Sequence, residues 1–508
     1  MGWDSSFRKT VIRGFARKRR IVNELRTAAT QGVVSFSEID DDLERGLANI
    51  PFGSAALVVV AGDQTHSVVL GNAAKRLPAT TSTPFHICSC SKTFTAAVFS
   101  RLVADGAICW DDPVRLLLPE FTFSDAWVSE HCTFRDLAAM RVGLTRDGIA
   151  EWGFRQNVPK AERLRRARCM ELTSPFRSGF SYSNLCYIGL ALAAERVADE
   201  PYSELLRKLI FAPLNLHDSW SEGGDVAEKK NKPAQPNVLI DGELTPVNEL
   251  TGPNSEGSAR VYLSPKDAAV WMRFLLAAYN GSDAGPLSSA TVKEMASPQS
   301  ILRGPGIHDS PERGWSSYGH GLFITNFLGE PLLRHGGGGR GLRHSMALAP
   351  RHDIGVMLMV TSESVGVDGL ALELLERLLT GKTRDWRTQF AENSEATAAA
   401  ERRSVEEKFS TIPAGMTVVD FREGDYCNDV TGVVRLTRKN DKLRFAPVDA
   451  PIFAASLRRL KDGTYELEFD EPALSRQPLD PLFRVRFQVD ATATTLSTSY
   501  FGELREVH

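Results

Sequence analysis

In the first 380 residues of this chain, strand-forming residues fall into two blocks that lie far apart. The first block, residues 55–71, has two apolar runs around a Gly62-Asp63 turn, which is typical of a β-hairpin. The second block, residues 321–360, contains four more apolar segments, and an amphipathic helix pattern over 366–380 follows it. Residues 107–320 have the patterns of helices and loops, and the richness of 221–258 in Gly, Pro, Asn, Asp and Lys predicts a long loop there. We therefore expect an α/β fold in which one antiparallel sheet is flanked by helices and carries an all-helical insertion.

The end of the chain alternates apolar and polar side chains. Two hairpins are predicted there, with turns at Asn440-Asp441 and Lys461-Asp462-Gly463, and a further strand at 483–487. A charged segment that contains an alanine run precedes them and indicates a helix. We expect a basic N-terminal segment (1–34), an α/β domain (35–380), a linker helix (381–410) and a small C-terminal β-barrel domain (411–508).

Charge and apolar content exclude several classes of protein. The 508 residues include 60 basic and 63 acidic ones. The chain therefore lacks the excess of positive charge that is typical of nucleic-acid-binding proteins, and no nucleic-acid partner is expected. The longest apolar runs, such as 55–60 and 356–360, are far too short to span a bilayer, so no integral membrane segment is expected.

The cysteines and the N-terminal residues 1–26 indicate the cellular compartment of the protein. The seven cysteines are odd in number and show no metal-ligand spacing, which favours free thiols, a reducing compartment and no metal site. Residues 1–26 carry eight basic and two acidic residues but no apolar core of a signal peptide, so we expect a cytoplasmic protein. A solvated helix explains this basic segment, while an organelle presequence or a patch attracted to anionic surfaces remains open.

The strongest candidate for chemistry is Ser89-Cys90-Ser91-Lys92, at the predicted start of a helix. A nucleophilic serine needs a base within hydrogen-bonding reach. The i, i+3 spacing places Lys92 one turn beyond Ser89 on the same helix face. The positive potential of a helix N-terminus also stabilises a developing alkoxide. The segment predicts nucleophilic catalysis, although the same four-residue pattern occurs at 6–9 without this context.

Two further motifs carry groups that could complete such a site. In Tyr182-Ser183-Asn184, the phenol could relay a proton and the amide could bind substrate and orient Lys92, although the triplet also fits a helix cap. In His335-Gly336-Gly337, the glycines let a substrate approach the backbone closely, although the histidine could equally be a packing residue. The glycine run also matches a dinucleotide-binding pattern, but the strand-like residues 345–350 that follow exclude that interpretation.

The order Ser-x-x-Lys, Tyr-x-Asn and His-x-Gly resembles that of the serine β-lactamase and penicillin-binding-protein family. The nearest branch contains class C β-lactamases, D-alanyl-D-alanine carboxypeptidases, D-aminopeptidases and β-lactamase-like esterases. Flanking segments agree: 106–120, 133–144 and Ile210-Phe211-Ala212-Pro213-Leu214, where Asn215 replaces the family's glycine. The resemblance covers about residues 35–380 and implies a β-lactamase/transpeptidase-like fold. The C-terminal domain resembles the lipocalin-like domains of some family members, which implies that it reaches over the cleft or merely packs beside it.

This resemblance implies a role for each motif residue. Ser89 is the acylated nucleophile, and Lys92 and Tyr182 share the base and acid roles. Asn184 positions substrate and Lys92. His335 stands where many relatives have the lysine of Lys-Thr-Gly, which disfavours a β-lactam or free-carboxylate substrate. The other implied substrate-binding residues are Gly337, Gly338 and Arg340. The backbone N–H of Gly338 would form an oxyanion hole together with that of Ser89. Arg340 is either a replacement cation or a surface residue.

The sequence therefore predicts a serine hydrolase that works through an acyl-enzyme, without metal or other cofactor. Its substrate is expected to be a small molecule or short peptide, with D-configured peptides or amides favoured over simple esters. Two alternatives remain. The first is acyl transfer to an amine, as in peptide-cyclising thioesterases of this family. The second is a binding or scaffold protein that kept the fold without the activity.

Overall fold

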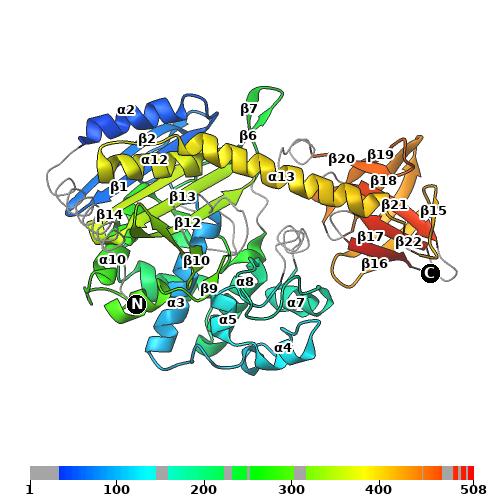
Figure 1. Cartoon of the computed structure of the whole chain (residues 1–508), viewed down its shortest axis with the longest axis horizontal. Helices are drawn as coiled ribbons and strands as arrows, with labels where there is room; N and C mark the ends of the chain where they lie inside the picture. The colour runs from blue at the N-terminus through cyan, green and yellow to red at the C-terminus, as the bar shows by residue number, and fades with distance from the viewer. Residues whose placement is uncertain are drawn as a thin grey trace, which may run out of the picture.

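The computed structural model describes residues 34–144, 158–221, 231–248, 252–302, 316–412, 414–448, 450–471, 484–489, 494–498 and 502–507. The predicted basic segment lies outside the described residues, apart from Val34. Figure 1 shows a large α/β body and a smaller β-barrel, with the long helix α13 (Trp386–Ser410) running from the first to the second.

The centre of the large body is one antiparallel sheet. Its order is β3 (Leu77–Pro78), β2 (Gln64–Ala74), β1 (Ser54–Ala61), β14 (Ile354–Val360), β13 (Leu342–Ala349), β12 (Glu330–Gly339), β11 (Phe323–Phe327), β10 (Ser316–Tyr318) and β9 (Ser300–Ile301). The pairing of β1 with β14, from Ala55 opposite Val360 to Ala61 opposite Ile354, joins the two blocks of strands. The predicted antiparallel sheet is thus confirmed.

Alternating side chains of the central strands enter two separate cores. Leu57 and Val59 of β1 pack with helices α2 (Phe36–Leu47) and α12 (Gly366–Thr380), which cover one face (Figure 1). Val58 and Val60 pack on the other face with α3 (Ser91–Ala104) and α10 (Pro265–Tyr279). This period of two is what a strand buried on both faces requires.

A helical region occupies the chain between β4 and β9. It contains α4 (Ala126–His131), α5 (Phe134–Ala138), α7 (Lys160–Arg165), α8 (Asn184–Ala198), α9 (Tyr202–Leu206), the π-helical turn η4 (Arg207–Phe211), α11 (Ser289–Met295) and the 3₁₀ turns η2 (Val114–Leu116), η3 (Arg166–Cys169) and η6 (Pro253–Ser255). A small sheet of β4 (Phe85–His86), β8 (Val261–Leu263) and β5 (Trp220–Ser221) borders it.

One sequence prediction is wrong in this region. Residues 221–258 were expected to be continuous loop, yet β6 (Asn237–Ile240) and β7 (Glu243–Pro246) form a hairpin. Its turn, Asp241-Gly242, has two consecutive positive φ angles, 52° and 84°. Such a two-residue turn matches the twist of paired strands, so the Asp-Gly pair was the signal that the loop interpretation missed.

The C-terminal domain is a closed up-and-down barrel. Its strands are β16 (Gly424–Asn428), β17 (Gly432–Lys439), β18 (Lys442–Pro447), β19 (Ala455–Arg459), β20 (Tyr465–Phe469), β21 (Arg484–Val489), β22 (Thr494–Thr498) and β23 (Gly502–Glu506). Each pairs with the next, and β23 pairs with β16 to close the ring. The strand β15 (Thr417–Val419) adds to β21, and η8 (Pro451–Phe453) precedes β19. The predicted barrel is confirmed.

The barrel touches the large body at two described places. Val430, before β17, is buried against the core of the helical region, and its carbonyl accepts a hydrogen bond from Arg166 Nη1 at 3.1 Å. Glu471, two residues after β20, forms an ion pair with Arg340 of the turn between β12 and β13. At the other end, α13 buries Trp386 and Phe390 in the core beneath α12.

Candidate active site

Ser89 lies where a short 3₁₀ turn runs into a buried helix. The turn η1 (Cys88–Cys90) continues directly into α3, since Cys90 and Ser91 both have right-handed helical angles. Cys88 has a φ of 49°, in the left-handed region that non-glycine residues rarely adopt. Such strain persists only where surrounding structure enforces it, and here it lies one residue before Ser89.

Four of the predicted side chains meet in one hydrogen-bonded cluster. Lys92 Nζ lies 3.1 Å from Ser89 Oγ and donates to Asn184 Oδ1 at 2.8 Å. Tyr182 Oη lies 2.8 Å from the same Ser89 Oγ. Ser89, Tyr182 and Asn184 are half-buried, whereas Lys92 is fully buried. The serine oxygen therefore faces two groups that can exchange a proton with it.

The Nζ of Lys92 is surrounded by hydrogen-bond partners and aromatic rings. Besides Ser89 and Asn184, its Nζ contacts the carbonyl of Ser258, to which it donates at 2.7 Å. The rings of Tyr182 and Tyr187 lie beside it, with centroids 5.0 and 5.9 Å from Nζ. The Ser258 acceptor belongs to the backbone, so side-chain patterns carried no signal for it.

Strand β12 passes directly over the segment that leads into Ser89. A Cβ added to Gly337 would lie 2.2 Å from the carbonyl oxygen of Ile87, so only glycine fits there. Gly338 comes next, and it is exposed at the strand end. The Cys90 thiol donates to the carbonyl of His335 at 3.3 Å, which ties strand and turn together. The close approach places the Gly338 backbone on the strand beside Ser89.

His335 is buried on the core side of β12. Its Nε2 lies 3.3 Å from Tyr318 Oη and its Nδ1 2.7 Å from the carbonyl oxygen of Gly336, and the ring packs 5.3 Å from that of Phe323. Burial, reinforced by the nearby charge of Lys92, lowers the pKa of His335 to about 3. The imidazole is therefore neutral at physiological pH and supplies no fixed positive charge.

Arg340 is not a surface residue. Only 3% of its side chain is exposed, and it forms the ion pair with Glu471 of the barrel. Its place in the turn after Gly338 and Gly339 keeps it beside the strand end. Arg340 is thus a buried cation whose carboxylate partner in the described structure comes from another domain.

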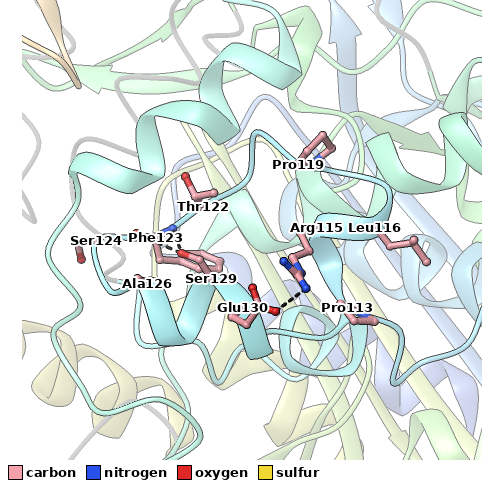
Figure 2. A pocket seen from close by; sticks show the side chains of 10 residues that line it. All are labelled: Pro113, Arg115, Leu116, Pro119, Thr122, Phe123, Ser124, Ala126, Ser129 and Glu130. Atoms are coloured by element: carbon pink, nitrogen blue, oxygen red, sulfur yellow. Dashed lines mark hydrogen bonds and ion pairs between the residues drawn. The ribbon is translucent and has the colours of Figure 1, made fainter.

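A separate groove of about 800 Å³ lies in the helical region (Figure 2). Its walls come from one stretch of chain, between Pro113 and Glu130, and an ion pair joins Arg115 to Glu130 across it. None of Ser89, Lys92, Tyr182 or Asn184 lines this groove. The groove is therefore separate from the hydrogen-bonded cluster.

Neither a metal cluster nor a spanning helix occurs in the part of the chain that the structure describes. No group of three or more His, Cys, Asp or Glu side chains there could hold a metal ion. No helix among the same residues is long and apolar enough to cross a membrane.

Comparison with known proteins gives one family for most of the chain. A family model described as Beta-lactamase matches residues 39–380. The unguisins hydrolase ungD' of Aspergillus campestris is 27% identical over 378 residues, which cover 71% of this chain and 69% of that protein. The D-alanyl-D-alanine-carboxypeptidase/endopeptidase AmpH of Escherichia coli K12 is 24% identical over 372 residues, or 68% of this chain and 92% of AmpH.

Solved structures agree on the fold. The octameric penicillin-binding protein homologue from Pyrococcus abyssi has a TM-score of 0.59 at 19% identity, covering 93% of this chain and 100% of that one. The D-amino acid amidase from Ochrobactrum anthropi SV3 has a TM-score of 0.54 at 24% identity, covering 70% of this chain and 97% of that one. At these identities, the likeness establishes architecture alone.

Proposed function

The chain belongs to the beta-lactamase family and is a serine hydrolase of that family, and we propose that it cleaves amide or peptide bonds through an acyl-enzyme on Ser89. The observation that carries the proposal is the position of Ser89 Oγ, 3.1 Å from Lys92 Nζ and 2.8 Å from Tyr182 Oη. A nucleophile held between two proton-exchanging groups is what acyl transfer requires.

The proposed reaction has two stages. Ser89 Oγ bonds to the substrate carbonyl carbon, and its proton passes to the neutral amine of Lys92, either directly or through Tyr182, which hands its own proton on to Lys92. The bond to the leaving group then breaks as the leaving nitrogen or oxygen takes that proton, which leaves the acyl-enzyme. A water molecule attacks the acyl carbon, gives a proton to the same pair, and releases the acid with Ser89 restored. The N–H groups of Ser89 and Gly338 are proposed to stabilise the oxyanion of both stages.

Asn184 and His335 have different places in this proposal. Asn184 binds Lys92 directly, so it orients the amine and stays half-exposed toward substrate. His335 is proposed as a positioning residue, because its side chain is fully engaged with Tyr318 and the Gly336 carbonyl. A neutral imidazole here favours neutral substrates over those that carry a carboxylate.

The relatives narrow the substrate class. Two of their names refer to D-configured substrates, a D-alanyl-D-alanine-carboxypeptidase/endopeptidase and a D-amino acid amidase, and a third relative is named an unguisins hydrolase. We propose D-configured amides and short peptides as the substrates, with simple esters as weaker ones. The seven cysteines are all free, five of them at least partly buried and two exposed, which supports the proposal of a reducing, cytoplasmic location.

A panel of matched D- and L-aminoacyl p-nitroanilides and short-chain esters tests this proposal. We expect turnover of D-aminoacyl anilides above that of their L-isomers. Added amine nucleophiles should leave the acid as the main product, whereas a dominant amide product would favour acyl transfer. No turnover and no labelling by a fluorophosphonate would favour the binding-protein alternative.

A further inference from the structure

We propose that Glu471 of the barrel is a specificity-determining residue, which occupies the Arg340 cation beside the active site and so selects against substrates that carry a carboxylate there. This inference rests on the proposed function of the Ser89 site. In this proposal, the C-terminal domain provides a carboxylate that competes with a substrate carboxylate for Arg340.

The backbone holds Arg340 close to the nucleophile turn. A Cβ added to Gly339 would lie 3.0 Å from the Cys88 thiol, so the end of β12 touches the residue before Ser89. On the other side, Gly341 has a φ of 68°, and an added Cβ would lie 2.5 Å from the backbone nitrogen of Asn237. Close contacts on both sides therefore fix the backbone of the turn that carries Arg340.

The charge of Arg340 depends on the barrel. A buried guanidinium needs an anion, because desolvation of an unpaired charge is expensive. The nearby Glu363 of the large body instead accepts from the backbone N–H of Gly341 at 3.1 Å. Within the part of the chain that the structure describes, Glu471 is the carboxylate paired with Arg340, and Arg340 Nε is a buried donor without a hydrogen-bond partner.

These features make Arg340 a carboxylate site that is already filled. A guanidinium presents several N–H groups in a fixed fork that suits a carboxylate, and one of them is still unused. A ligand carboxylate would have to displace Glu471, which is 33% exposed and so within reach of solvent. Removing the Glu471 charge should convert Arg340 from a neutralised cation into a site for anionic ligands.

The test uses N-acetyl-D-alanyl-D-alanine and its terminal amide, which differ only in the charge near the leaving side. Both are titrated by calorimetry into full-length Ser89→Ala and into Ser89→Ala with Glu471→Gln, so that chemistry is absent. We expect Glu471→Gln to raise the ratio of acid to amide affinity at least about tenfold, the size of one charge-assisted hydrogen bond. Adding Arg340→Gln should remove that gain.

Glu468→Gln is the matched control. It removes a carboxylate three residues earlier in the chain, within β20, that pairs with Arg458 at 2.8 Å, and it should leave the ratio unchanged. Glu471→Asp keeps the charge on a shorter side chain and should give a smaller rise in the same direction. An unchanged ratio in both Glu471 variants, or a gain that persists without Arg340, overturns the inference. Failure of Ser89-intact enzyme to hydrolyse either peptide overturns the proposed function instead, because the affinity ratio does not depend on turnover.

Discussion

The two ends of the candidate site are stabilised by different parts of the molecule. At the Ser89 end, the cluster is complete within the family domain, where Lys92 bonds to Ser89, Asn184 and the Ser258 carbonyl. At the Arg340 end, the cation obtains its counter-charge from Glu471, 131 positions further along the chain. The difference suggests that the large body provides the chemistry and the barrel adjusts which ligands reach it.

Removing the nucleophile should have the largest effect and should separate chemistry from folding. Ser89→Ala is expected to lower kcat/KM at least about 10⁴-fold with an unchanged unfolding transition, since the half-buried hydroxyl makes few other contacts. Ser91→Ala is the control. Its hydroxyl accepts from the backbone N–H of Val261 at 3.1 Å, so its loss should cost about 1 kcal/mol of stability and little activity. Comparable activity losses in both variants would contradict the assignment.

Breaking the proton-exchanging pair should have the next largest effect. Lys92→Met and Tyr182→Phe should each lower kcat about 10²-fold, because each removes a group within hydrogen-bonding distance of Ser89 Oγ. The double variant should lose far less than the product of the two, because the groups act on one oxygen. Tyr187→Phe is the control, since its hydroxyl donates to the Ala138 carbonyl at 2.9 Å and not to Ser89. Additive losses would mean that the two groups act separately.

Filling the space between β12 and the nucleophile turn should disturb the site by geometry alone. Gly337→Ala would place its Cβ 2.2 Å from the Ile87 carbonyl oxygen, so the strand or the turn must move. We expect a loss of about 10-fold to 10²-fold in kcat, the range for a misplacement near 1 Å. Gly338→Ala meets only the end of the Arg343 side chain, at 3.1 Å, and should lose less. The reverse order would contradict the close approach described here.

Acid should weaken the large body through its buried histidines. Burial lowers the pKa values of His320, His335 and His344 to about 3, below the ordinary 6.5. The unfolded chain therefore binds more protons below pH 6.5, and stability falls as pH drops from 6.5 towards 3, by about 1.4 kcal/mol per pH unit for each histidine. Urea unfolding between pH 7.5 and 5 measures this slope. His320→Leu should lower the slope of the unfolding free energy against pH by the contribution of about one proton. An unchanged slope would contradict the burial of His320.

The same pKa of His335 predicts a small effect on activity. The imidazole stays neutral above about pH 4, so its titration should not change kcat/KM near pH 6.5. His335→Gln should therefore leave the shape of the plot of kcat/KM against pH unchanged in this range. The two profiles, measured from pH 5 to 8 on a neutral substrate, should have the same shape. A limb that disappears in the variant would show that His335 titrates in this range.

Local spacing predicted the part of the site that lies on one helix. Ser89 and Lys92 are three residues apart, so helical geometry alone brings them together. The meeting of Tyr182 with Ser89 spans 93 positions and was available only through resemblance to a family. The Arg340–Glu471 pair had no signal, because charged residues are common and their partners depend on how two domains dock.

The fold shows the same limit. Alternation predicted five of the eight barrel strands, β17 to β21, while β16, β22, β23 and the closure of the ring depend on strand number and register. The burial of His335 likewise depends on tertiary packing, because its ring lies against Tyr318 and Phe323 of other strands. Sequence patterns thus specified elements and local pairs, and tertiary packing decided the rest.

Mass spectrometry of a trapped intermediate identifies which serine is acylated. The enzyme is quenched during turnover of a slow D-aminoacyl ester and digested, and the acylated peptide is sequenced. The account predicts one acyl group on Ser89, absent from Ser89→Ala. An acyl group on Ser91 or Ser183 instead would contradict it.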